Sequence, residues 1–171
     1  MTNLENTPLE IERKFLIEYP DTQMLRKLPD CKVKEIVQTY LLCENGTMRV
    51  RKTLCCKKTT YRFNEKHSIS AISRTEEEKE LSEAEYNLLL TRKDGSRSAI
   101  EKVRYAFPFG EHILEIDVYP FWSDRAILEI ELSCEDEEYV IPEFIRVIKE
   151  VTGDNRYSNK SLAKCIINEK L

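Results

Sequence analysis

The chain has 171 residues, which is enough for one domain with a sizeable core and too few for two ordinary domains. We therefore expect a single domain over residues 1–171. Charged residues make up 34% of the chain, but acids and bases nearly balance at a net charge of −4. Bulk charge therefore gives no reason to expect a nucleic-acid or membrane partner.

Cysteine and histidine usage argues against the common zinc sites. The six cysteines show no Cys-x-x-Cys spacing and the chain has only two histidines. The opening Met-Thr-Asn-Leu-Glu-Asn lacks the basic start and apolar run of a signal peptide, and no apolar run approaches the roughly 20 residues that cross a bilayer. We expect reduced thiols and a cytoplasmic protein.

The first predicted strand, residues 10–17, gathers charge on one face. Glu10, Glu12 and Lys14 share that face because side chains alternate along a strand, and neighbours on one face lie about 6.6 Å apart. Two like charges at that distance repel by roughly 2.5 kcal/mol at an effective dielectric near 20, so a buried pair of carboxylates needs a cation. A solvated strand face also alternates charge, so this segment alone does not establish a site.

Further strand signals follow, separated by turn residues. Glu44-Asn45-Gly46 supplies residues that tolerate positive φ in a tight hairpin. Pro108-Phe109-Gly110 and Phe121-Trp122-Ser123-Asp124 interrupt the later strands. The predicted strands are residues 10–17, 35–43, 47–55, 60–66, 72–81, 100–107, 112–119 and 126–134.

Helix signals are fewer. Ser82 and Glu85 have the spacing of a capping box, and an apolar stripe follows before Asp94-Gly95. A second helix is predicted from Pro142 to Val151, and shorter helical turns are expected near residues 21–28 and 159–167. Many strands with few helices favour the α+β class, with an antiparallel barrel or sandwich covered by the helices.

Paired charges recur on one face of the predicted strands. The cations on this face are Lys14, Arg49, Arg51, Lys66, Arg74, Lys102 and Arg104. The carboxylates are Glu10, Glu12, Glu76, Glu78, Glu115, Asp117, Glu129 and Glu131. The side chains on the other face of these strands are apolar and need to be covered. If the helices cover that face from outside, the charged face points into the barrel. Cation pairs suit phosphates and carboxylate pairs suit Mg²⁺ or Mn²⁺, which predicts a metal–polyphosphate site; the alternative is a self-satisfied ion-pair network.

The order and spacing of these motifs resemble the CYTH domains, or triphosphate tunnel metalloenzymes. The resemblance covers nearly the whole chain. Its segments are Glu10-Ile11-Glu12-Arg13-Lys14, Gln38-Thr39-Tyr40-Leu41, Met48-Arg49-Val50-Arg51, Lys66, Arg74-Thr75-Glu76-Glu77-Glu78, Glu101-Lys102-Val103-Arg104-Tyr105, Glu115-Ile116-Asp117-Val118, Glu129-Ile130-Glu131-Leu132 and Arg156-Tyr157-Ser158-Asn159-Lys160-Ser161-Leu162-Ala163. It implies an eight-stranded antiparallel β-barrel that encloses a charged tunnel for triphosphate and a divalent metal.

The resemblance also implies roles for the matched positions. The implied ligands of one or two Mg²⁺ or Mn²⁺ ions are Glu10, Glu12, Asp117, Glu129 and Glu131. The implied phosphate clamp is Lys14, Arg49, Arg51, Lys66, Arg74, Lys102 and Arg104. Glu76 or Glu78 would orient the attacking water, and Lys14 and Arg51 would stabilise charge during catalysis. Asn64 stands where many members have threonine, and because its amide can still donate, we expect a tuned site.

The implied activity is metal-dependent hydrolysis of inorganic triphosphate, with nucleoside or thiamine triphosphates as further small-molecule substrates. A class IV-type adenylyl cyclase that makes cyclic AMP from ATP shares the same motifs, although the C-terminal motif resembles the bacterial tripolyphosphatase-like members more closely. A non-catalytic polyphosphate- or nucleotide-binding module is the third alternative. Assembly into a homodimer stays open.

Four residues outside the charged pattern have simpler interpretations. Tyr40 and Tyr157 either contact the ligand or pack in the lumen. Trp122 is predicted to be a packing anchor in a loop, and Lys160 to be a solvated helix lysine.

Overall fold

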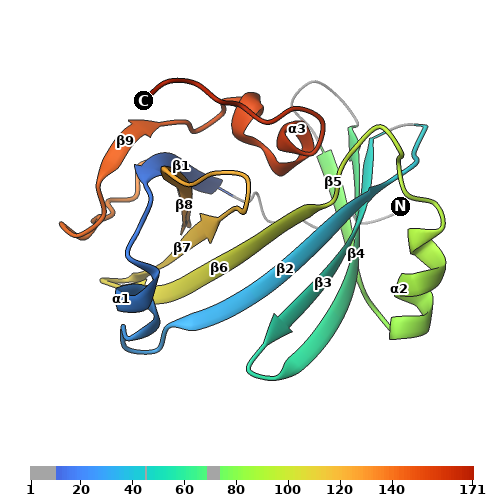
Figure 1. Ribbon diagram of the computed structural model, residues 1–171, viewed down its shortest axis with the longest axis horizontal. Helices are drawn as coiled ribbons and strands as arrows, with labels where there is room; N and C mark the ends of the chain where they lie inside the picture. Colours follow the sequence, from blue (N-terminus) through green and yellow to red (C-terminus); the bar gives the residue numbers. More distant parts are fainter. Residues whose placement is uncertain (1–10, 45, 69–73) are drawn as a thin grey trace, which may run out of the picture.

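The computed structural model describes residues 11–44, 46–68 and 74–171, and of residues 66–68 and 74–76 it describes the backbone alone. The strands are β1 (Ile11–Glu18), β2 (Lys32–Leu41), β3 (Thr47–Cys55), β4 (Lys58–Ser68), β5 (Arg74–Leu81), β6 (Ile100–Phe109), β7 (His112–Val118), β8 (Arg125–Leu132) and β9 (Val147–Glu150). The helical segments are α1 (Thr22–Arg26), α2 (Glu83–Leu90), the 3-10 turn η1 (Asn155–Tyr157) and α3 (Asn159–Leu162). The strands form one sheet in the order β5-β4-β3-β2-β6-β7-β8-β1-β9 (Figure 1).

The predicted strands are all present, with shifted ends. β3 has the predicted bounds, and Gly46 before it has the positive φ (+88°) that the hairpin requires. β6 continues through Pro108 and Phe109, so the predicted break at Pro108 is wrong and the turn falls at Gly110, where φ is +61°.

The prediction of a closed eight-stranded barrel is wrong. The sheet is open and has nine strands, with β5 and β9 at its ends. Strand β1 pairs antiparallel with β8 on one side and with β9 on the other. Because both hydrogen-bonding edges of β1 are occupied, β1 cannot also close a barrel against β5.

The predicted helix over residues 142–151 is also wrong. Ile145 N donates to Pro142 O at 2.9 Å in a turn, and β9 follows directly. Phe15 is opposite Glu150 and Leu16 is opposite Lys149 in the β1–β9 register. The segment is rich in β-branched residues, so the free edge of β1 overrides a weak helical pattern.

Helix α2 begins with the predicted capping box. The hydroxyl of Ser82 accepts a hydrogen bond from Glu85 N at 3.2 Å, and the Glu85 carboxylate accepts one from Ser82 N at 2.8 Å. Tyr86 packs with Leu81 and Val50 in a buried cluster. Helix α2 therefore covers the apolar side of the sheet at its β3–β5 end, as predicted.

This cap makes the stability of α2 depend on pH. Hydrogen bonds from the Ser82 backbone and hydroxyl, with the nearby Lys79, lower the pKa of Glu85 from 4.5 to about 2. Because the folded-state pKa is depressed, the stabilisation is present above the unfolded value and is lost as the pH falls toward the folded value. We expect the Glu85 carboxyl to titrate near pH 2 by NMR and nearer 4.5 in Ser82→Ala. Titration near 4.5 in the unaltered protein would contradict the cap.

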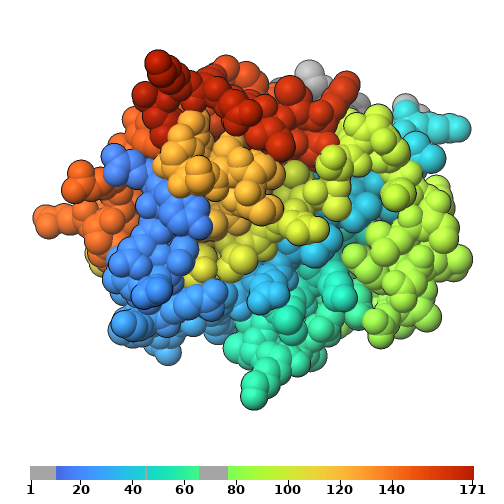
Figure 2. Space-filling model, in the orientation of Figure 1, coloured from blue at the N-terminus to red at the C-terminus, as the bar shows by residue number. Residues whose placement is uncertain are grey.

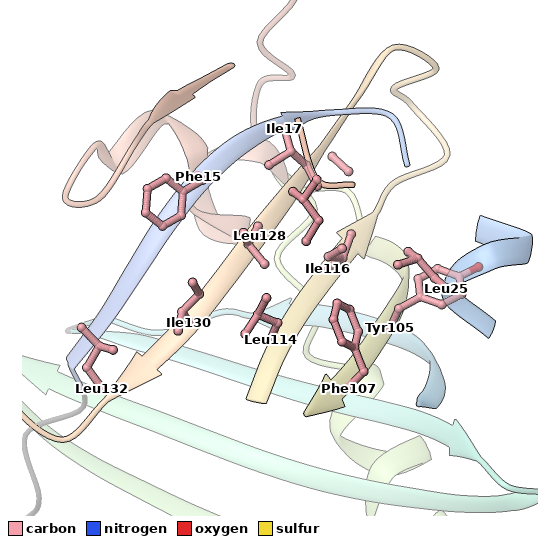
Figure 3. Packing of buried hydrophobic residues seen from close by; sticks show 12 residues of the cluster. Phe15, Ile17, Leu25, Tyr105, Phe107, Leu114, Ile116, Leu128, Ile130 and Leu132 are labelled. Atoms are coloured by element: carbon pink, nitrogen blue, oxygen red, sulfur yellow. The ribbon is translucent and has the colours of Figure 1, made fainter. Parts of the chain in front are cut away.

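The main apolar cluster lies on the face of the sheet opposite the predicted charges. Phe15 and Ile17 of β1 lie beside Leu128 and Ile130 of β8, as Figure 3 shows. Leu114 and Ile116 of β7 and Tyr105 and Phe107 of β6 continue the same cluster. It is covered by Leu25 from α1 and by Ile145 from the turn before β9, and not by a second long helix.

A second apolar cluster closes one end of the charged side. Leu16 of β1 and Ile127 of β8 share their parity with the charged residues of those strands, yet both are fully buried. Tyr157 of η1 and Leu162 of α3 pack against them. The C-terminal segment, red in Figure 2, lies along the top of the molecule in this view. None of the described helices is long and apolar enough to cross a membrane.

Candidate active site

Arg104 on β6 is the centre of the charged face. Its Nε and Nη2 donate to the two carboxylate oxygens of Asp117 at 2.6 and 2.7 Å. Its Nη2 also donates to Glu129 at 2.6 Å, and its Nη1 donates to Glu115. Arg104 and Asp117 are opposite each other in the β6–β7 register, so strand pairing itself brings the fork to the carboxylate.

Asp117 on β7 is a fully buried carboxylate held by two cations. Lys102 Nζ donates to Asp117 Oδ2 at 2.5 Å, and Lys102 is itself buried. Burial alone would raise the pKa of Asp117, but Lys102 and Arg104 hold it well below its usual value. The carboxylate therefore stays ionised between these two cations.

Lys14 on β1 lies between two carboxylates, as the charge pattern of the first strand requires. Its Nζ is 3.0 Å from Glu129 and 3.2 Å from Glu12. Burial lowers the pKa of Lys14, but Glu129 and Glu12 outweigh that effect and the pKa is raised above its usual value. Lys14 is therefore protonated throughout the neutral range.

Glu12 and Glu131 face each other across β1 and β8. They are directly opposite in the register, two positions along the strands from Lys14 and Glu129 and on the same face. Opposite side chains in an antiparallel pair have Cβ atoms about 4.5–5.5 Å apart, and like charges there are destabilising. Among the described residues, no three acidic, histidine or cysteine side chains are grouped closely enough to hold a metal ion. Glu10, a further predicted ligand, lies outside the described residues.

Arg51 on β3 is held by a buried glutamine. Gln38 Oε1 accepts from Arg51 Nη2 at 3.2 Å, and Gln38 Nε2 donates to the Tyr40 hydroxyl at 2.7 Å. Arg49 also donates to that hydroxyl. Gln38 is opposite Arg51 in the β2–β3 register, so strand pairing brings the two side chains together.

The positive charge of Arg51 is offset only in part, by the carboxylates of Asp117 and Glu78. Burial, followed by the nearby Arg49 and Arg104, lowers the pKa of the Arg51 guanidinium. Its Nε is buried and has no hydrogen-bond partner among the described residues. Because an arginine stays protonated in proteins, the surplus charge and the free donor favour an anion at this point.

Replacing Gln38 with leucine is expected to destabilise the protein by about 1–3 kcal/mol, because the substitution strips hydrogen-bond partners from Arg51 and Tyr40 in a buried position. Gln38→Glu is the matched control, since its carboxylate still accepts from Arg51. The free energies of unfolding come from urea denaturation. Equal stability of Gln38→Leu and the unaltered protein would show that the hydrogen bonds contribute nothing.

Glu78 on β5 borders the charged face. It accepts hydrogen bonds from Asn64 Nδ2 at 2.8 Å and from Arg62 Nη1 at 2.6 Å, and its side chain is 43% exposed. Asn64 is buried and donates, as expected of this position. The backbone register places Lys66 opposite Glu76 and Ser68 opposite Arg74. The side chains of Lys66, Arg74 and Glu76 lie outside the described residues.

Two participants in this network, Gln38 and Glu115, were assigned no metal, substrate or catalytic role from the sequence. Gln38 is uncharged, so no charge pattern could indicate it, although its parity with Tyr40 could have done so. Glu115 belonged to the predicted carboxylates, and here it joins Arg104 to Lys34, whose Nζ lies 3.7 Å from it.

The residues outside the charged pattern lie at the closed end of the face. Trp122 is buried and its Nε1 donates to Ile167 O at 2.9 Å, which confirms the packing role. Tyr157 is buried and packs in the same cluster. Lys160 is exposed, and its Nζ donates to Thr47 Oγ1 at 2.7 Å.

A cavity of about 490 Å³ lies beside this network, and Lys102 forms part of its lining. It is lined by Val37, Val103 and Val118, whose parity is opposite to that of Lys102 and Asp117. Lys102 is the cation in this lining, whereas the charged network brings several cations together, so the network is the better candidate for phosphate and metal chemistry.

Two relatives of this chain are named inorganic triphosphatases. The chain is 32% identical over 163 residues to the inorganic triphosphatase of Nitrosomonas europaea, a match that covers 92% of this chain and 98% of that protein. It is 36% identical over 100 residues to the inorganic triphosphatase of Acetivibrio thermocellus, covering 58% of this chain and 62% of that protein. The crystal structure of the inorganic triphosphatase NE1496 is 27% identical, with a TM-score of 0.60 over 94% of this chain and 97% of that one. No protein-family model matches the chain.

The open antiparallel sheet with cations and carboxylates on one face defines the class of protein. Its likeness to NE1496 extends over nearly the full length of both chains. The chain belongs to the CYTH, or triphosphate tunnel metalloenzyme, family.

Proposed function

We propose that this chain hydrolyses inorganic triphosphate with Mg²⁺ or Mn²⁺ as cofactor. The observation that carries the proposal is the segregation of charge on one face of the sheet. Arg51, Arg49 and Lys102 come from the central strands, whereas Glu12 and Glu131 face each other near the β1–β8 end. The names of the relatives at 32% and 36% identity support the same activity.

The cations are proposed to bind the substrate. Arg51 supports this role best, because it is half-buried beside Arg49 and Arg104 and its Nε has no partner among the described residues. The phosphate clamp would consist of Lys14, Arg49, Arg51, Lys66, Arg74, Lys102 and Arg104. A polyanion here would relieve the repulsion among the arginines. The same attraction between cations and phosphate oxygens would bind the substrate and stabilise charge during the reaction.

The carboxylates are proposed to hold the metal. The proposed set is Glu10, Glu12, Asp117, Glu129 and Glu131. Glu12 and Glu131 fit best, because both are exposed carboxylates opposite each other, and Mg²⁺ and Mn²⁺ prefer oxygen ligands. Asp117 and Glu129 already accept hydrogen bonds from Arg104, so they would also offset part of the positive charge of the phosphate clamp. When bound, the ion would offset phosphate charge and polarise a phosphoryl oxygen.

The remaining steps are assigned to side chains of the chain itself. Glu78 would accept a proton from the attacking water, because its exposed carboxylate is oriented by Asn64 and Arg62; Glu76 is the alternative. Lys14 stays protonated and, with Arg51, would stabilise the charge on the departing phosphate oxygens.

A comparison of substrates tests this proposal. The purified protein is incubated separately with inorganic triphosphate, ATP and thiamine triphosphate, each with Mg²⁺, with Mn²⁺ and with a chelator. Orthophosphate and pyrophosphate produced mainly from inorganic triphosphate would support the proposal. Cyclic AMP and pyrophosphate from ATP would replace it with the cyclase activity, and tight binding without turnover would replace it with a binding module.

A further inference from the structure

The β3–β4 hairpin ends in two adjacent cysteines. Cys55 is the last residue of β3, and Cys56 and Lys57 form the connecting turn with φ of +51° and +65°, the positive values that a type I′ turn requires. The sulfur atoms of Cys55 and Cys56 are 3.7 Å apart, and Cys56 is exposed. The other four cysteines are not adjacent in the sequence, so this is a distinct pair of thiols.

The separation of the sulfurs fits a chelate. A centre bonded to two sulfurs at about 2.3 Å, with a bond angle of roughly 95–110°, holds them about 3.4–3.8 Å apart. The hairpin therefore needs no backbone movement to bind such a centre. A disulfide would require the sulfurs to approach to about 2.05 Å within a ring that spans one peptide bond, which disfavours it.

The surrounding charges decide which centre fits. Cys55 is opposite Lys34 of β2 and Lys58 of β4, and Lys57 follows in the turn. These lysines would repel a dication such as Zn²⁺, but they do not oppose a neutral ligand. Burial, followed by the Cys56 thiol, raises the pKa of Cys55, while Lys34 and Lys32 pull it down. At neutral pH the Cys55 thiol is therefore mainly protonated, and its proton must leave when a bond to the ligand forms.

We propose that Cys55 and Cys56 form a bidentate site for neutral trivalent arsenicals and chemically related metalloids. In the reaction with an arsine oxide, two As–S bonds form and the bonds between arsenic and oxygen break. The two thiol protons leave with the oxygen as water, and no atom changes oxidation state. This site is independent of the proposed hydrolysis, because it uses none of the residues assigned to that reaction.

The reduced protein is titrated with phenylarsine oxide and examined by intact mass spectrometry. We expect one tight adduct, equal in mass to protein plus reagent minus one water. Cys55→Ser and Cys56→Ser should each weaken binding by about 100-fold or more, because the second bond of a chelate is intramolecular. Cys134→Ser and Cys165→Ser are the matched controls and should bind as the unaltered protein does.

Several results would overturn the proposal. Equal binding by Cys55→Ser would place the adduct elsewhere. Loss of two hydrogens without an adduct would show a disulfide in place of a chelate. Binding of Zn²⁺ to the Cys55–Cys56 site as tightly as the arsenical binds would contradict the argument that the lysines exclude a dication.

Discussion

Replacing Glu12 with alanine is expected to lower metal-dependent turnover of triphosphate by about 10³-fold, to the limit of detection, because it removes one of two facing carboxylates proposed to hold the ion. The fold should persist. The Glu12 side chain is 44% exposed and forms an ion pair with Lys14, and a surface ion pair contributes at most about 1 kcal/mol. Activity and stability are therefore expected to separate in this variant.

Glu101→Ala is the matched control for Glu12→Ala. Glu101 is also an exposed strand glutamate, but its parity is opposite to that of Lys102 on the same strand. Its substitution should leave turnover unchanged. Calorimetric titration with Mn²⁺ adds a readout that does not depend on activity, and Glu12→Ala should bind the ion more weakly. Turnover or Mn²⁺ binding retained in full by Glu12→Ala would remove Glu12 from the metal site.

Arg104→Ala is expected to cause the largest loss of stability, about 3–5 kcal/mol, because it removes the guanidinium that Asp117, Glu129 and Glu115 share and leaves an excess of buried negative charge. Arg104 side-chain exposure is 14%, and Asp117 is completely buried beside it. Arg104→Lys keeps the positive charge but loses the guanidinium that binds Asp117 through two nitrogens. Its free energy of unfolding should therefore lie between those of the unaltered protein and Arg104→Ala. Chemical denaturation measures each free energy of unfolding.

Arg13→Ala is the control for the arginine substitution. Arg13 lies on the other face of β1 and pairs with Glu150 at 3.3 Å, both partly exposed, so its loss should cost less than about 1 kcal/mol. If Arg104→Ala destabilises no more than Arg13→Ala, the buried network contributes little to the fold.

The parity of the strands was predictable because it depends only on local alternation. Lys14 and Arg104 lie on the face where alternation places them, and the apolar parity of β7 and β8 forms the core. Strand β9, at one end of the sheet, was not predictable in the same way. Residues 144–148 carry apolar side chains at a spacing that suits a helix, and only the distant free edge of β1 selects a strand for the end of this segment.

The members of the charged face could be predicted, but their pairing could not. A charge pattern identifies Arg104, Asp117 and Glu129 as candidates, yet it does not say that one guanidinium contacts both carboxylates. That contact depends on the order β6-β7-β8, which is a non-local property. Gln38 is a harder case, because an uncharged residue gives no signal until its register with Arg51 is known.

The most direct test of the proposed activity is a ³¹P NMR time course of inorganic triphosphate with the protein and Mg²⁺. We expect the triphosphate signals to be replaced by equal amounts of pyrophosphate and orthophosphate, and the conversion to stop when a chelator is added. Triphosphate that persists with Mg²⁺ and with Mn²⁺, while the protein stays folded, would contradict the assignment of the charged face as a triphosphatase site.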